Sequence, residues 1–103
     1  MANNSRPLAR LERSLTTENL WLYILSTLKK KRTYAYALNL QIKERFGWKP
    51  GLITSYLVFY KLQAEGLITS KYDERRKYYE ITKKGKDALM EGKKMLLKLA
   101  KDL

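Results

Sequence analysis

The chain has no cysteine and no histidine among its 103 residues. The lack of cysteine excludes disulfide bonds, thiolate metal sites and cysteine nucleophiles. The lack of histidine removes the commonest general base and the commonest ligand of transition metals. Acidic residues are also few, ten Asp and Glu against 22 Lys and Arg, and they are scattered along the chain. We therefore expect no enzyme, no metal site and no cofactor.

Long apolar runs are missing too. The longest, residues 20–25, is far shorter than the roughly 20 residues that a membrane-spanning helix needs. The first 15 residues contain no apolar segment of the kind found in signal peptides. We expect a cytoplasmic protein with no membrane partner.

The excess of Lys and Arg gives the chain a formal net charge of +12. Such a charge favours acidic partners, nucleic acid first and an anionic membrane surface second. The length allows one domain with a small core, and dimerisation is a common way for such domains to bury more surface. Nucleic-acid binding is the function that the composition predicts.

Apolar residues recur at helical spacing in successive segments before residue 66. A short helix carries Leu8, Leu11 and Leu15, and Thr17 is predicted to cap the helix that follows it. The segment 34–47 ends at Gly47 and the segment 52–65 is followed by Gly66, as helices often are. The residues predicted to face inward from the second and third helices are Leu20, Ile24, Leu25, Leu28, Ala35, Leu38, Ile42 and Phe46.

The pattern changes after residue 66. Residues 67–72 and 77–82 are rich in β-branched and aromatic side chains and flank the charged sequence DERR, which predicts a hairpin. Helical spacing then returns from residue 83 to the end. Compact helices followed by a hairpin form a winged helix-turn-helix. We expect a mainly α fold with a β-hairpin, in which residues 1–82 bind DNA and residues 83–103 form a dimerisation helix within one structural domain.

The last predicted helix carries an apolar stripe, which we call the C-terminal seam. Its residues alternate spacings of three and four: Leu89, Gly92, Leu96, Leu99 and Leu103. A single terminal helix has no second helix of its own to coil against, so a second copy is the predicted partner and the chain a homodimer. Gly92 would let two helices approach closely. The alternative is that the stripe packs back on its own domain.

The predicted wing, residues 71–79, is strongly basic, with cations placed at the hairpin tip. Long cations on a stiff ribbon suit a groove edge or a track of phosphates. Strand alternation puts Tyr78 and Tyr79 on opposite faces, so one can pack on the core and the other can donate its hydroxyl to a phosphate. The predicted DNA contacts of the wing are Lys71, Arg75, Arg76, Lys77 and Tyr78. The alternative is that the charged tip serves only solubility and edge protection.

The helix predicted over residues 52–65 is the candidate recognition helix, although it has little charge. Ser55, Phe59 and Leu62 share one face of it at core spacing. The opposite face is apolar as well, and such groups can contact thymine methyls while tyrosine and threonine hydroxyls reach base edges. We expect a preference for A·T-containing sites. The predicted contacts are Lys49, Ile53, Thr54, Tyr56, Leu57, Tyr60 and Lys61; the alternative is that another part of the dimer covers the apolar ones.

Four segments resemble the PadR-like family of winged-helix transcriptional regulators. They are LERSLTTENLWLYILSTLKK, YAYALNLQIKERFGWKP, YKLQAEGLI and RRKYYEITKKGK, the last being the most specific. The resemblance implies a homodimer that represses transcription, with the recognition helix and the wing on a palindromic operator. The entry GLIT and Leu57 depart from the family pattern of small residues and a proline after the tyrosine. This departure bears on which bases are read.

The same resemblance suggests a ligand, because relatives sense aromatic or drug-like molecules near the dimer interface. Trp21 is the candidate ligand residue, since it occupies a place that is often polar in the family. It could instead pack against the C-terminal helix of the other subunit. Two further alternatives to a regulator remain, an architectural protein that coats DNA and a protein-interaction module.

Overall fold

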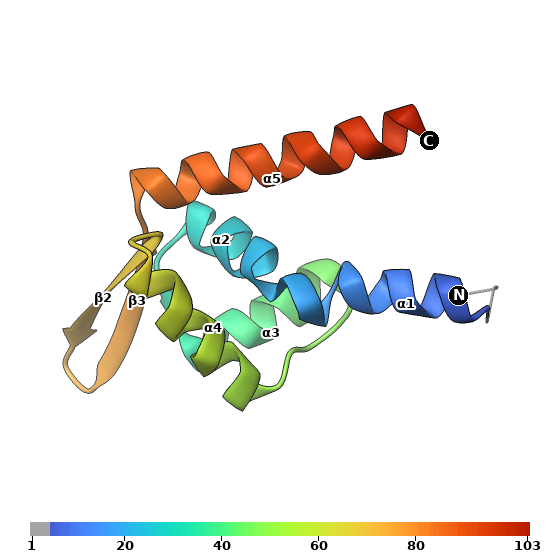
Figure 1. The fold of residues 1–103 in the computed structure, drawn as a ribbon. Coiled ribbons are helices and arrows are strands. Elements are labelled where there is room, and N and C mark those ends of the chain that lie inside the picture. Colours follow the sequence, from blue (N-terminus) through green and yellow to red (C-terminus); the bar gives the residue numbers. More distant parts are fainter. Residues whose placement is uncertain (1–4) are drawn as a thin grey trace.

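The computed structural model describes residues 5–103. Figure 1 shows α2, α3 and α4 gathered into a compact unit with the hairpin at one side, while α1 and α5 extend beyond it in the same direction. This arrangement confirms the predicted winged helix-turn-helix. The helices are α1 (Arg6–Ser14), the 3₁₀ helix η1 (Thr17–Asn19), α2 (Leu20–Lys30), α3 (Ala35–Phe46), α4 (Leu52–Ala64) and α5 (Lys83–Asp102), and the strands are β1 (Thr33–Tyr34), β2 (Ile68–Asp73) and β3 (Arg76–Ile81).

The sheet has three antiparallel strands in the order β1-β3-β2, one more than the predicted hairpin. The added strand β1 is only two residues long, and Tyr34, expected to begin a helix, pairs with Tyr78 instead. Two residues are too few to show the alternation by which strands are recognised. The strand ties the start of the helix-turn-helix directly to the wing.

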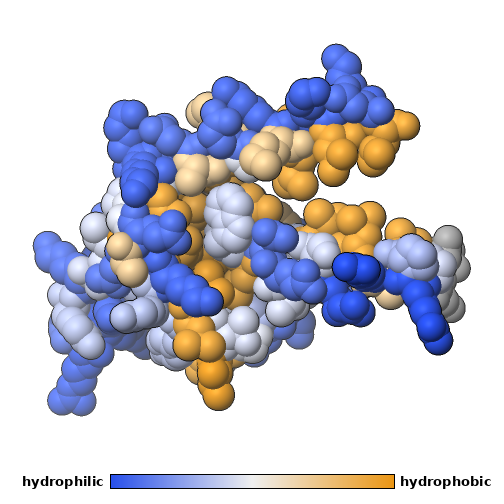
Figure 2. All heavy atoms as spheres, in the orientation of Figure 1, coloured by the Kyte–Doolittle hydropathy of each residue, from blue (hydrophilic) through white to orange (hydrophobic). Residues whose placement is uncertain are grey.

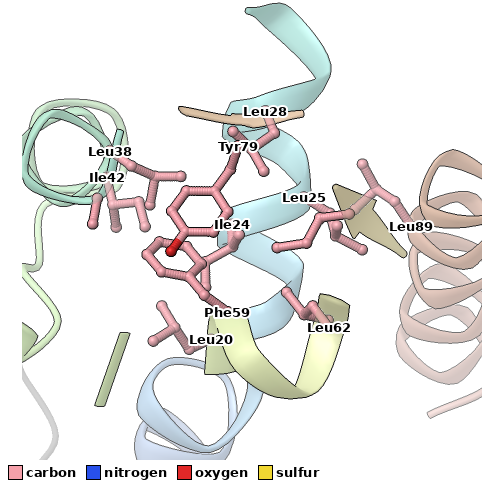
Figure 3. Close-up of a cluster of buried hydrophobic side chains, with 12 residues drawn as sticks. Leu20, Ile24, Leu25, Leu28, Leu38, Ile42, Phe59, Leu62, Tyr79 and Leu89 are labelled. Atoms are coloured by element: carbon pink, nitrogen blue, oxygen red, sulfur yellow. The ribbon is translucent and has the colours of Figure 1, made fainter. Parts of the chain in front are cut away.

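The core lies between α2, α3, α4 and the sheet. Phe59 of α4 stacks on Tyr79 of β3 with ring centroids 4.4 Å apart, at the centre of the cluster in Figure 3. All the predicted inward residues of α2 and α3 are buried except Phe46, which is 40% exposed. Phe46 lies at the edge of the core, where its ring meets that of Tyr23 edge-to-face at 4.8 Å.

The connections between helices are only partly as predicted. Thr17 does not cap α2, because it begins the 3₁₀ turn η1, and this turn is held to α1 by a bond from Asn19 Nδ2 to the Ser14 carbonyl. The two glycine stops are confirmed, since Gly47 (φ 81°) and Gly66 (φ 76°) follow α3 and α4 in the left-handed region. Both turns therefore need the conformational freedom of glycine.

The first half of α5 packs against α2 of the same chain. Leu89 is buried in the common core, and an added Cβ on Gly92 would lie 2.9 Å from Leu22 and 3.0 Å from Trp21. Gly92 thus allows a close approach, but to α2 rather than to a second copy. The rest of the C-terminal seam, Leu96, Leu99 and Leu103, is exposed. Among residues 5–103, no helix is long and apolar enough to cross a membrane.

Candidate nucleic-acid interface

The helix α4 is anchored through one face and exposed through the other. Its buried face holds Ser55, Phe59 and Leu62, as predicted. Ser55 Oγ donates to Asn39 Oδ1 on α3 at 2.9 Å, and Asn39 Nδ2 donates to the Pro50 carbonyl at 3.4 Å. Because buried polar groups are costly unless they are paired, this network holds α4 at one angle to α3 and to the turn between them.

The opposite face of α4 carries large apolar side chains that nothing in residues 5–103 covers. Ile53 is 80% exposed, Tyr60 76% and Leu57 59%. In Figure 2, apolar atoms protrude at the end of the molecule away from α5, where α4 lies in Figure 1. A surface helix normally turns polar residues outward, so this face is suited to contact with a partner.

The remaining predicted contacts of this region surround that apolar face. Tyr56 and Lys61 are exposed on α4, and Thr54 is half-buried. Lys49, in the turn before α4, is also exposed, with its Nζ 6.0 Å from the centre of the Tyr36 ring. The helix α4 contains no acidic residue. The structure therefore brings these side chains to one surface that carries no carboxylate from α4.

One face of the sheet is occupied by alternating arginines and tyrosines, which we call the arginine–tyrosine ladder. Arg32 lies over the Tyr78 ring at 4.4 Å, Arg76 lies over the Tyr34 ring at 4.3 Å, and the two rings meet edge-to-face at 5.7 Å. Such cation–π contacts are worth about 0.5–1 kcal/mol each at exposed sites. Arg76 and Tyr78, expected on DNA, are thus engaged within the chain and stiffen the wing.

An ion pair adds to the ladder, because Arg32 also contacts Asp73 at 3.1 Å across the sheet. Arg32 and Asp73 are 41 residues apart, and no pattern in the sequence predicted that Arg32 would contact the wing. Its place depends on β1, which periodicity could not detect. The pair neutralises Asp73, the last residue of β2, whereas Glu74 lies in the turn that follows.

The wing cations outside the arginine–tyrosine ladder lie at the tip and beside it. Arg75 lies in the turn and Lys71 on β2, and both are exposed. Lys77 extends along the Tyr79 ring, with its Nζ 5.7 Å from the ring centre. These three remain the wing residues best placed to meet phosphates.

A hollow of about 460 Å³ separates the wing from the helix-turn-helix. Its lining combines cations with tyrosines, namely Tyr36, Tyr56, Tyr72, Arg75, Arg76 and Lys77 among others. Tyr36 and Tyr72 were not predicted as site residues. Tyr72 is 69% exposed, and this exposure could not be recognised from the sequence. Burial raises the pKa of Tyr79 at the base of this hollow, and Tyr56 and Tyr72 raise it further, so its hydroxyl stays neutral.

Trp21 lies away from this surface. Its indole N–H donates to Asn19 Oδ1 at 3.1 Å, and its ring edge packs on Gly92 of the same chain. The expected contact with the C-terminal helix is therefore made within one chain, because α5 folds back over α2. In the described part of the chain, no group of three or more Asp and Glu is placed to hold a metal ion.

Comparisons with known proteins agree with this geometry. A model of the "Transcriptional regulator PadR-like family" matches residues 24–91. A PadR family transcription regulator from hypervirulent Clostridium difficile R20291 is 33% identical over 80% of this chain and 91% of its own, with a TM-score of 0.74. A transcriptional regulator from Clostridium thermocellum is 30% identical over 81% and 86%, with a TM-score of 0.72. A PadR family regulator from Eggerthella lenta DSM 2243 is 26% identical over 92% and 87%, with a TM-score of 0.81. No curated protein matches the chain.

Proposed function

The chain belongs to the PadR-like family of transcriptional regulators, and from that premise we propose that it is a sequence-specific repressor that binds double-stranded DNA as a homodimer. In this proposal α4 enters the major groove and the wing lies on the backbone or in the minor groove. The observation that carries it is the exposed apolar face of α4 beside a basic wing. The protein would act in the cytoplasm and without catalysis.

The two surfaces divide the work of binding. Phosphate contacts supply most of the salt-dependent affinity but carry no base sequence, whereas groove contacts specify the bases. The wing cations Lys71, Arg75 and Lys77 fit the first role. Ile53 and Leu57 fit the second through thymine methyls, with the Tyr60 hydroxyl near base edges. A site rich in A·T pairs is the expected target.

The homodimer rests on the exposed end of α5. Leu96, Leu99 and Leu103 are exposed in the single chain. Figure 2 shows apolar atoms on the side of α5 that faces α1, across an open slot. A second copy would bury them, and a two-fold dimer would read a palindromic operator. An aromatic effector that binds near Trp21 stays a prediction from the sequence, because the Trp21 ring packs on α5 of its own chain.

Replacing Leu57 and Tyr60 together by alanine tests the reading role of α4. The DNA is a site selected from random sequences by the unaltered protein. The double variant should bind this site about 10- to 100-fold more weakly, because removing a base contact costs roughly 1–3 kcal/mol. Its affinity for unrelated DNA and its salt dependence should stay the same, since no phosphate contact is removed. Fluorescence anisotropy at several salt concentrations measures both.

Met90→Ala is the matched control, because Met90 is a similarly exposed apolar residue on α5, far from the proposed DNA surface. It should bind as the unaltered protein does. Unchanged affinity and base preference in the Leu57→Ala, Tyr60→Ala variant would show that α4 does not read the DNA.

A further inference from the structure

The first helix, α1, has two sharply different faces and no buried residue. Leu8, Leu11 and Leu15 follow one another at spacings of three and four, which places them on one side. Arg6, Arg10 and Arg13 follow at spacings of four and three and lie on the opposite side, which we call the arginine face. Within residues 5–103, the fold gives the arginine face no partner.

The arginines of the chain divide into two groups by their contacts. Three are engaged by their own chain: Arg32 and Arg76 in the ladder, and Arg45 with Ser26 and the Phe46 ring. Within residues 5–103, the others make no ion pair, hydrogen bond or ring contact through their guanidinium groups. These are Arg75 at the wing tip and the three of the arginine face. Within residues 5–103, the arginines of α1 therefore resemble Arg75, the arginine best placed to meet DNA, in having no guanidinium contact.

No carboxylate of α1 neutralises the arginine face. Glu12 comes four residues after Leu8 and so lies on the leucine side of the helix. Glu18, just beyond α1, accepts a hydrogen bond from Ser14 Oγ at 3.3 Å. Within residues 5–103, three positive charges along about 10 Å of helix therefore have no ion-pair partner. That arrangement costs stability through repulsion unless an anionic partner binds there.

The arginine face points to the same side of the molecule as the candidate DNA surface. In Figure 2 the atoms of α1 turned toward α5 are apolar and those turned away are strongly hydrophilic. In Figure 1 α4 and the hairpin tip also lie on the side of the molecule away from α5. A duplex laid against α4 and the wing would therefore run along the side that α1 presents.

We propose that the arginine face of α1 is an additional phosphate-binding surface, which grips the DNA backbone apart from the contacts of α4 and the wing. This inference rests on the proposed function. Guanidinium groups bind phosphate oxygens in a bidentate manner, which a solvated lysine face does less well, and α1 holds arginines and no lysine. The helix lies outside residues 24–91, the part that matches the family.

The test is a triple variant, Arg6→Gln, Arg10→Gln, Arg13→Gln, bound to the selected site over a range of salt concentrations. Glutamine keeps the helix and its polarity but removes the charge. The slope of log affinity against log salt should fall by about 0.9 for each phosphate that is no longer neutralised. Ethylation interference should lose a discrete group of phosphates while those contacted by α4 and the wing remain.

The control removes three positive charges elsewhere, by Lys86→Gln, Lys93→Gln and Lys101→Gln on α5, and should leave both readouts as they are. A second variant with lysine at all three arginine positions keeps the charge and should restore most of the slope, which separates phosphate binding from a change in folding. Equal slopes and equal interference patterns for the arginine and control variants would overturn the inference. The proposed function would still stand if both variants kept the phosphate contacts of α4 and the wing at the selected site. If the unaltered protein bound no discrete site, the proposed function itself would fall.

Discussion

Replacing Lys71, Arg75 and Lys77 together by alanine should weaken binding to every DNA sequence, by roughly 100-fold or more at 0.1 M salt. Each phosphate contact changes the affinity with salt by a log–log slope of about 0.9, so one contact is worth about 8-fold at that concentration. The slope should fall by about 2.7 for each protomer if all three cations meet phosphates. Base preference should not change, because the apolar face of α4 is left intact.

The control replaces the same three α5 lysines, Lys86, Lys93 and Lys101, this time by alanine. It removes an equal charge far from the wing. It should change affinity much less, since exposed charges separated by more than about 8–10 Å are largely screened at physiological salt. If the wing and control variants weakened binding equally, the wing would have no specific role. The affinity would then come from overall charge alone, as in a protein that coats DNA.

Gly85→Ala should strongly destabilise the protein. An added Cβ would lie 2.1 Å from the Leu67 carbonyl oxygen and 2.8 Å from Ile81 Cγ1. That oxygen accepts the Thr82 N–H at 3.1 Å, so the backbone cannot yield without breaking the junction of wing and α5. We expect a loss of about 3 kcal/mol in the free energy of unfolding and a Tm lower by at least about 12 °C.

Gly51→Ala is the matched control in a melting experiment followed by circular dichroism. An added Cβ there meets only Thr54 Oγ1 at 3.7 Å, and φ is −66°, which alanine adopts readily. This variant should melt within a few degrees of the unaltered protein, because the gain from a less flexible unfolded chain is offset by the loss of glycine at the N-cap of α4. If the Gly85→Ala variant melted at the same temperature as the Gly51→Ala variant, α5 would not pack this closely on the base of the wing.

Helical periodicity explains why most of the fold could be predicted. The stripes of α2, α3 and α4 each repeat over several turns, and glycines mark where α3 and α4 end. The two faces of α4 followed from the same spacing, since Phe59 and Ser55 are buried while Ile53 and Leu57 are exposed. Repeated local patterns of this kind are the strongest signal in a sequence.

The misses share another cause, which is contact between distant segments. Strand β1 is two residues long and exists because β3 pairs with it, and Arg32 reaches Asp73 only through that pairing. Spacing alone could assign Leu89 to a seam but could not tell which helix would cover it. The structure gives Leu89 to its own core and leaves the later leucines exposed.

Binding to particular sites in double-stranded DNA underlies the proposed function, and hydroxyl-radical footprinting on long genomic fragments measures it. We expect discrete, two-fold symmetric protected sites that share an A·T-rich element. The Leu57→Ala, Tyr60→Ala variant should lose protection at these sites before it loses general binding. Uniform protection along the fragments at every protein concentration would contradict sequence-specific binding and indicate a protein that coats DNA.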